Sequence, residues 1–173
     1  MKSNRALFLD RDGVINLDYG YVHKICDFTF RPEIFEICKT ALSLKYKIII
    51  VTNQAGIGRG IFTENDFITL CNYMKSIFKQ NKIKITDIYH CPFHPKKGIN
   101  KFLKESFDRK PNPGMLIKAA IDHKIKLEDS IMIGDNISDQ QAALSANLKY
   151  FINANEESWG SETIKLLKAN LNY

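Results

Sequence analysis

Two aspartates near the amino terminus are the residues best suited to do chemistry. Asp10 and Asp12 follow the apolar run of residues 6–9, and Gly13 comes directly after them. Side chains alternate along a strand, so both carboxylates would emerge on one side. If the run is a buried strand of a parallel sheet, the pair lies at its carboxyl end, where such sheets bind ligands. The pair could then hold a divalent cation while one carboxylate attacks a substrate, although Asp and Gly are also common in simple turns.

Three further segments offer polar groups at comparable positions. The β-branched run 47–52 ends in Thr52, whose hydroxyl can bind a phosphate oxygen. Arg109 and Lys110 place two cations just before a predicted helix, and another short apolar run ends in Asp135. Four strand or loop ends therefore each supply a group that phosphate chemistry needs.

Taken in chain order, these groups and the Gly-Asp-x-x-x-Asp string of residues 134–139 resemble the haloacid dehalogenase-like (HAD) superfamily of phosphotransferases. Longer strings resemble the D-glycero-D-manno-heptose 1,7-bisphosphate 7-phosphatase family; they cover residues 10–16, 18–23, 52–60 and 109–115. Histidinol phosphatases share several of these pieces. The strings Gly-Tyr-Val-His (20–23) and Pro-Gly-Met (113–115) favour the heptose family.

The resemblance implies an α/β, three-layer Rossmann-like HAD fold with a central parallel sheet, helices on both faces and only small loop insertions as a cap. The alternation of predicted strands and helices independently favours a parallel sheet. We expect one domain over residues 1–173, with residues 91–108 as a loop insertion near the active site. Predicted strands cover residues 6–9, 47–52, 83–89, 130–135 and 149–152. Predicted helices cover residues 33–44, 114–124, 139–146 (capped by Ser138) and 162–171. A further helix is predicted to begin at the capping box Thr63-x-x-Asp66. Residues 55–60 are expected to form a flexible loop.

The resemblance also implies a two-step phosphatase mechanism that depends on magnesium. Asp10 would attack phosphorus to give an aspartyl-phosphate, and Asp12 would protonate the leaving oxygen and then activate water. Mg²⁺ would be held by Asp10, the backbone carbonyl of Asp12, and Asp135. Thr52 and Lys110 would hold the phosphoryl oxygens.

A wider set of residues is expected to bind substrate. It comprises Arg11, Asp18, Tyr19, Gly20, Tyr21, Thr52, Asn53, Gln54, Ala55, Arg109, Lys110 and Asn136. Arg109 is expected to recognise the C1 phosphate, since arginine can bind phosphate bidentately. Plainer interpretations exist: Thr52 could only end a strand, and Arg109 could be a surface cation. Asp139 is expected to lie behind the direct metal ligands or to favour the start of its helix.

One departure from the family concerns a loop zinc site. The family commonly binds zinc through Cys-Pro-His and a later Cys-x-Cys, whereas Phe93, Ser106 and Asp108 stand at three of those positions here. Structural zinc needs four donors, so we expect no structural zinc. A different set of donors could still bind a metal ion, namely His90, Cys91, His94 and Asp108.

Composition limits the classes of function. The 25 Lys and Arg exceed the 19 Asp and Glu, but the cations are scattered and are not interleaved with aromatic residues, which argues against a nucleic-acid partner. The four cysteines show no paired spacing, and no segment has the length and apolarity of a signal peptide or membrane span. We expect a cytoplasmic monomer without nucleic-acid or membrane partners.

The expected function is therefore that of a phosphoric monoester hydrolase that removes the C7 phosphate of heptose 1,7-bisphosphate. Its product would feed nucleotide-activated heptose synthesis for a surface glycan such as lipopolysaccharide or capsule. The alternative is a phosphatase for histidinol phosphate or another small sugar phosphate. A nonenzymatic module would be expected to lose one of the catalytic groups, and a receiver domain places its acids differently. The sequence leaves open the C1 anomer, the glycan and the oligomeric state.

Overall fold

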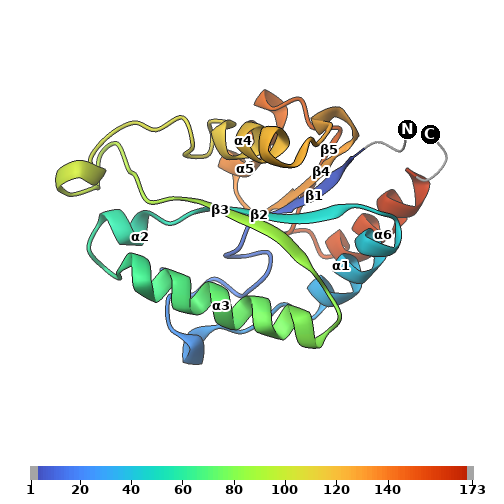
Figure 1. Cartoon of the computed structure of the whole chain (residues 1–173), viewed down its shortest axis with the longest axis horizontal. Helices are drawn as coiled ribbons and strands as arrows, with labels where there is room; N and C mark the ends of the chain where they lie inside the picture. The colour runs from blue at the N-terminus through green and yellow to red at the C-terminus, as the bar shows by residue number, and fades with distance from the viewer. Residues whose placement is uncertain (1–3, 171–173) are drawn as a thin grey trace.

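The computed structural model describes residues 4–170 and contains one five-stranded parallel sheet. The strands are β1 (Ala6–Leu9), β2 (Lys47–Asn53), β3 (Ile85–Cys91), β4 (Ile131–Gly134) and β5 (Tyr150–Asn153), in the order β3-β2-β1-β4-β5. Helices α1 (Glu33–Ser43), α3 (Glu64–Gln80) and α6 (Trp159–Ala169) cover one face, and α4 (Gly114–His123) and α5 (Ile137–Ser145) cover the other (Figure 1). The expected three-layer α/β fold with a central parallel sheet and helices on both faces is confirmed.

The central strand β1 shows why the sheet is buried on both faces. Leu7 and Leu9 belong to the core cluster under α1, α3 and α6, whereas Ala6 and Phe8 belong to the cluster under α4 and α5. All four residues are fully buried because helices cover both sides of the strand. The chain leaves this strand at Asp10, which fixes the first aspartate at the carboxyl edge of the sheet.

The predicted capping box of α3 is confirmed. Thr63 Oγ1 accepts a hydrogen bond from the backbone N–H of Asp66 at 3.1 Å, and the Thr63 N–H donates to Asp66 Oδ2 at 2.8 Å. These reciprocal bonds satisfy donors that the first helical turn leaves unpaired. They fix the start of α3 close to the segment that follows Thr52.

Two sequence predictions about local structure are wrong. The glycine-rich segment after Thr52 contains a single helical turn, α2 (Ala55–Gly58), because its glycines allow close packing: a Cβ at Gly58 would lie 2.2 Å from the carbonyl oxygen of Pro92. Helix α5 is capped by Asn136 and not by Ser138, which lies inside the helix. The Asn136 N–H donates to Asp139 Oδ2 at 3.0 Å, and this capping box makes Asn136 the residue that begins the helix.

Element boundaries differ modestly from the predictions. Strand β3 runs two residues further, to Cys91, so the irregular 91–108 segment begins at the end of a strand and contains the short 3-10 helix Asn100–Phe102. Helix α6 begins earlier than predicted, at Trp159, whose buried ring lies 4.5 Å from the Arg31 guanidinium. The predicted end of that helix at Leu171 lies outside the described residues. Two further 3-10 helices occur at Ile25–Asp27 and Leu127–Asp129.

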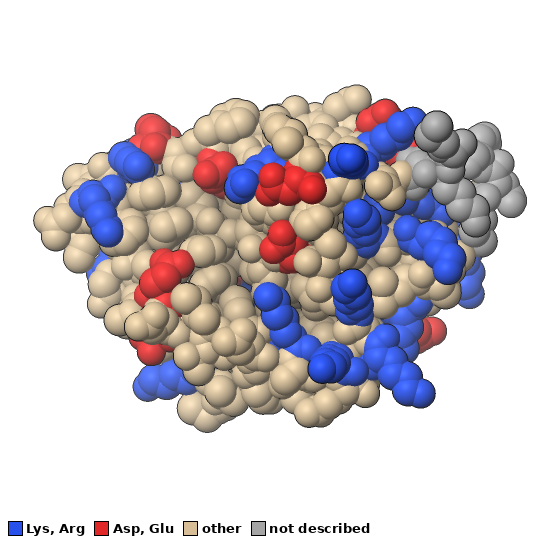
Figure 2. Space-filling model, viewed as in Figure 1, with Lys and Arg blue, Asp and Glu red and all other residues tan. Residues whose placement is uncertain are grey.

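The charged side chains are distributed over the surface. On the face shown in Figure 2, Lys and Arg are more numerous toward α1 and α6, and Asp and Glu lie among them. Within residues 4–170, the structure contains no helix that combines the length and the apolar character of a membrane span.

Candidate active site

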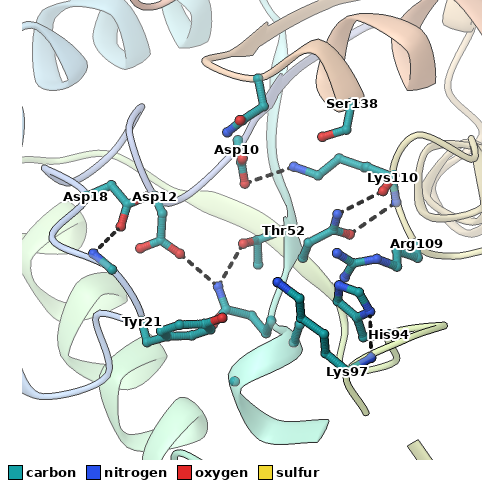
Figure 3. A pocket seen from close by; sticks show the side chains of 16 residues that line it. Asp10, Asp12, Asp18, Tyr21, Thr52, His94, Lys97, Arg109, Lys110 and Ser138 are labelled. Atoms are coloured by element: carbon teal, nitrogen blue, oxygen red, sulfur yellow. Dashed lines mark hydrogen bonds and ion pairs between the residues drawn. The ribbon is translucent and has the colours of Figure 1, made fainter. Parts of the chain in front are cut away.

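A cavity of about 460 Å³ opens at the carboxyl edge of the sheet (Figure 3). Twelve of its lining residues are predicted site residues: Asp10, Asp12, Asp18, Gly20, Tyr21, Thr52, Asn53, Gln54, Ala55, Arg109, Lys110 and Asn136. The cavity is also lined by Gly56, His94, Lys97 and Ser138, none of which the sequence predicted to bind substrate. Arg11, Tyr19 and Asp135 are not among the lining residues. Side chains separated by up to 128 positions in the chain thus share one cavity.

A buried cluster of opposite charges lies at the floor of this cavity. The Lys110 ammonium contacts Asp10 Oδ1 at 2.9 Å and Asp139 Oδ1 at 2.6 Å, and it donates to the carbonyl oxygen of Val51 at 2.9 Å. All three side chains of the ionic cluster are almost completely buried. Lys110 is therefore held by three acceptors and cannot move without leaving carboxylates unpaired.

The combined effect of burial and neighbouring charges raises the pKa values of Asp10, Lys110 and Asp135. Burial raises the pKa of Asp10 to about 7; Lys110 opposes this rise, and the nearby Asp139 carboxylate adds to it. Burial disfavours the charged form of Lys110, but Asp10 and Asp139 outweigh that effect and raise its pKa. The pKa of Asp135 is also raised, first by burial and then by Asp139. The site holds more negative than positive charge, which is the condition under which a bound cation stabilises it.

Three carboxylates are close enough to share a cation. Asp10, Asp135 and Asp139 each have an oxygen within 4.8 Å of the others. Asp139 is already committed, because its Oδ2 accepts the backbone N–H groups of Asp135 and Asn136 and its Oδ1 contacts Lys110. Asp10 and Asp135 therefore remain as carboxylate donors, and oxygen donors of this kind suit Mg²⁺.

Gly13 makes the approach of Asp135 possible. Gly13 has φ +81°, and a Cβ built there would lie 2.2 Å from Asp135 Oδ2. Any side chain at this position would push the carboxylate away from Asp10. The glycine that follows the aspartate pair in the sequence thus has a specific geometric role.

Asp12 is held by neutral and cationic donors. Arg11 Nη2 lies 2.7 Å from Asp12 Oδ2, Gln54 Nε2 donates to the same oxygen at 3.0 Å, and Asn16 Nδ2 donates to Oδ1 at 3.1 Å. Gln54 Nε2 also donates to Thr52 Oγ1 at 2.9 Å, which leaves the hydroxyl hydrogen of Thr52 free to donate to a ligand. The orientation of Asp12 and the donor direction of Thr52 are thereby linked through one amide.

Asn53 contacts the chain around Lys110. Its Nδ2 donates to the backbone carbonyl of Lys110 at 2.9 Å, and its Oδ1 accepts the N–H of Lys110 at 3.1 Å. The sequence predicted Asn53 as a substrate-binding residue. In the structure, these two hydrogen bonds make it a clamp on the backbone that carries Lys110.

Two predicted substrate residues point elsewhere. The Arg11 side chain is buried and donates to Asp12 and to the Val22 carbonyl, the latter at 2.6 Å, so any contact of Arg11 with substrate would come from its backbone. Tyr19 is 65% exposed and lines a neighbouring hollow instead of the main cavity. The sequence strings could not show the directions of these two side chains.

The loop formed by residues 18–23 makes one wall of the cavity. Asp18 Oδ1 accepts the N–H of Gly20 at 2.8 Å, which closes a tight turn. Tyr21 points its ring toward the cavity, and its hydroxyl contacts Arg59, whose guanidinium carbon lies 5.1 Å from the ring centre (Figure 3). His23 stacks on Phe62 at 5.0 Å. These contacts attach the wall to the region after α2.

The 91–108 segment makes the opposite wall and is held by packing. Phe93 lies 5.9 Å from Phe102 between ring centres, and the Lys104 ammonium lies 4.1 Å from the centre of the Phe93 ring. The carbonyl oxygen of Phe93 accepts from Arg109 Nη1 at 3.1 Å. Phe93 therefore connects both ends of this wall.

The donors considered for a substitute metal site are dispersed. His90 pairs with Glu64 at 2.6 Å, and His94 Nδ1 accepts backbone N–H groups. Burial, with the positive charges of Arg109 and Lys97, holds the pKa of His94 below its usual range. Within residues 4–170, His90, Cys91, His94 and Asp108 form no metal-binding cluster. Lack of structural zinc stays a prediction.

Comparisons with known proteins identify the family to which this chain is similar. Residues 107–155 match the HAD-hydrolase-like family model. A D-glycero-alpha-D-manno-heptose-1,7-bisphosphate 7-phosphatase from Burkholderia mallei is 50% identical over 84% of this chain and 77% of that protein. The corresponding D-glycero-beta-D-manno enzyme of Helicobacter pylori is 45% identical over 86% of this chain and 83% of that protein.

Solved structures share the fold. A HAD-like protein from Mesorhizobium loti has a TM-score of 0.89 and 26% identity, covering 97% of this chain and 88% of that one. The D,D-heptose 1,7-bisphosphate phosphatase from B. bronchiseptica, complexed with magnesium and phosphate, has a TM-score of 0.76 and 24% identity, covering 94% and 86%.

A relative from Campylobacter jejuni, also named as a D-glycero-alpha-D-manno-heptose-1,7-bisphosphate 7-phosphatase, is matched almost from end to end. Its 46% identity extends over 98% of this chain and 95% of that protein. With the aspartate pair, the lysine cluster and the parallel sheet in place, this similarity shows that the chain belongs to the D-glycero-D-manno-heptose 1,7-bisphosphate 7-phosphatase family of HAD-like hydrolases.

Proposed function

We propose that this protein removes the C7 phosphate of D-glycero-D-manno-heptose 1,7-bisphosphate, as its relatives are named to do. The observation that carries the proposal is the cavity floor, where Asp10 lies 2.9 Å from the buried Lys110 ammonium and Asp12, two residues further along the chain, lines the same cavity. A nucleophile, an acid and base, and a fixed cation are thus combined in one cavity. The product would serve nucleotide-activated heptose synthesis for a surface glycan.

The chemistry proceeds in two displacements. An Asp10 carboxylate oxygen attacks the phosphorus of the C7 phosphate, and the bond from phosphorus to the sugar oxygen breaks as Asp12 donates a proton to that oxygen. A water molecule then attacks the aspartyl-phosphate and gives its proton to Asp12. Inorganic phosphate leaves, and the Asp10 carboxylate is restored.

The remaining floor residues position the transferred group. Thr52 has a free hydroxyl hydrogen to donate to a phosphoryl oxygen, and Lys110 supplies a fixed positive charge at the same place. Asp139 and Asn53 position Lys110, through its side chain and its backbone respectively. Loss of either would displace the cation from the reacting phosphate.

Magnesium fits the carboxylates of this site. We propose that Asp10, Asp135 and the backbone carbonyl of Asp12 would hold Mg²⁺, which when bound offsets the repulsion between an anionic nucleophile and a phosphate dianion. The excess of carboxylate over cationic groups around Asp10 supports this assignment. Asp139 is excluded as a ligand by its contacts with Lys110 and two backbone N–H groups.

The opposite wall is suited to the second phosphate. We propose that Arg109 binds the C1 phosphate, since it lines the cavity while Phe93 occupies only one of its guanidinium nitrogens. The remaining residues of the sugar-binding wall are Asp18, Gly20, Tyr21, Gln54, Ala55 and Asn136. Arg11 and Tyr19 lie next to this wall.

The protein is proposed to act as a one-domain monomer in the cytoplasm, a setting consistent with its four free cysteines.

The direct test is phosphate release in the presence of Mg²⁺ from both anomers of heptose 1,7-bisphosphate and from histidinol phosphate, measured side by side. We expect kcat/KM for one heptose anomer to exceed that for histidinol phosphate by at least about tenfold, which needs only about 1.4 kcal/mol of differential transition-state binding. The relatives include enzymes named for each anomer, so this assay also assigns the anomer.

Asp10→Asn is the control for the catalytic assignment. The substitution keeps the size of the side chain but removes the nucleophile, so turnover should fall below detection while the circular dichroism spectrum is unchanged. A wild-type preference for histidinol phosphate would replace the proposed substrate with the alternative one.

A further inference from the structure

The wall formed by the 91–108 loop carries donors that the two displacements do not use. His94 and Lys97 line the cavity beside Arg109. Figure 3 shows these three side chains grouped together, apart from the carboxylates of Asp10 and Asp12. The cavity therefore has an acidic end where the reaction occurs and a basic end that faces the rest of the substrate.

His94 presents a defined donor. Its Nδ1 accepts the backbone N–H groups of Lys96 and Lys97, each at 3.1 Å. A ring nitrogen that accepts hydrogen bonds carries no proton, so the proton of the neutral ring is on Nε2. Within residues 4–170, no protein group accepts a hydrogen bond from Nε2, which leaves this donor available to a ligand.

Lys97 presents an unpaired charge from an anchored backbone. In the described part of the chain, its ammonium forms no ion pair with a carboxylate within 4 Å. Its N–H is bound to His94, and the neighbouring Ile99 N–H donates to the carbonyl oxygen of Gly58 at 2.8 Å. The loop is thus attached to α2 close to the lysine, and the cation is kept at the cavity.

We propose that His94 and Lys97 join Arg109 in a second anion subsite that binds the phosphate group that is not hydrolysed. The inference rests on the proposed function, and it makes these two loop residues specificity-determining residues for bisphosphates over monophosphates. A phosphate dianion has several acceptor oxygens, and a neutral N–H donor, an ammonium and a guanidinium can bind them together.

The test compares Lys97→Met with Lys96→Met. Methionine keeps most of the aliphatic length and removes the charge, and Lys96 is an adjacent exposed lysine that does not line the cavity. The readout is the ratio of kcat/KM for heptose 1,7-bisphosphate to kcat/KM for heptose 7-phosphate. We expect Lys97→Met to lower this ratio about tenfold, the size of one charge-assisted hydrogen bond at a partly exposed site, and Lys96→Met to leave it within twofold.

His94→Asn tests the second donor. The asparagine carbonyl can replace Nδ1 as the acceptor for the two backbone N–H groups, whereas nothing replaces the Nε2 donor. The ratio should fall about three- to tenfold, with little change in melting temperature because the turn is retained.

Each outcome is informative. An unchanged ratio in both Lys97→Met and His94→Asn, or an equal fall in Lys96→Met, would overturn the subsite. If wild-type protein shows no preference for the bisphosphate over the 7-phosphate, the proposed function fails and the subsite fails with it. If the wild type prefers the bisphosphate and the variants do not alter that preference, the result contradicts the subsite but not the proposed function.

Discussion

At the residue scale, Asp10 and Asp135 could be predicted to share one site because each directly follows a recognisable apolar run. Asp10 and Asp135 come directly after buried strands, so their positions at one edge follow from parallel pairing. The direction of a side chain depends on the path of the backbone around it. The sequence could not show that Arg11 turns back to Asp12, or that Asn53 binds the backbone of Lys110.

The titration of Asp10 gives a prediction about stability without metal. Its pKa of about 7 in the folded protein lies above the ordinary 3.8, so the folded state holds the proton more tightly than the unfolded state. Stability from this group is therefore present at low pH and is lost as pH rises from about 4 to about 7. Asp10→Asn removes this pH-dependent loss of stability. Lys110 still has the Asp139 carboxylate as its ion-pair partner in the variant.

Urea unfolding in a metal chelator measures this effect. We expect Asp10→Asn to be more stable than wild type at pH 8, on the order of 1–3 kcal/mol, with the difference shrinking toward pH 5. A difference that is the same at both pH values would show that the Asp10 carboxylate is not the group that titrates.

At the element scale, the repeating patterns of the sheet and helices were predictable, and the irregular segments were not. Strands and amphipathic helices have periods that the sequence displays, whereas α2 and the 91–108 loop depend on close contacts between distant residues. For this reason the sequence considered His94 only as a possible metal donor and did not single out Lys97. The only available signal was the polar, basic composition of a long loop next to the site.

The packing of Phe93 gives a prediction about this loop. Phe93→Ala removes the contacts with Phe102 and Lys104, so the wall that carries Arg109 should loosen. We expect faster proteolytic cleavage within residues 93–108 and a several-fold higher KM for heptose 1,7-bisphosphate. The lost aromatic and cationic contacts amount to about 1–2 kcal/mol.

Phe107→Ala is the matched control, because Phe107 lies in the same loop but is 61% exposed. It should change neither cleavage nor KM by more than about twofold, since a largely exposed side chain makes few stabilising contacts. Similar effects in both variants would mean that Phe93 has no special role in holding the wall.

At the scale of the whole molecule, the topology explains how a single sheet assembles the cavity. The sheet order β3-β2-β1-β4-β5 brings the ends of β1, β2 and β4 together, and the chain between β3 and α4 adds the basic wall. The cavity therefore has carboxylates at Asp10 and Asp12, where we propose that phosphorus is attacked, and a basic wall, where we propose that a second anion binds. A substrate with two separated phosphates matches both ends.

The most direct test of this account is a phosphorus NMR time course of heptose 1,7-bisphosphate with the enzyme and Mg²⁺. We predict that the C7 phosphate signal is replaced by inorganic phosphate while the C1 phosphate signal remains, and that Asp10→Asn leaves both signals unchanged. Loss of the C1 signal first, or turnover by Asp10→Asn, would contradict the orientation of the substrate or the role of Asp10.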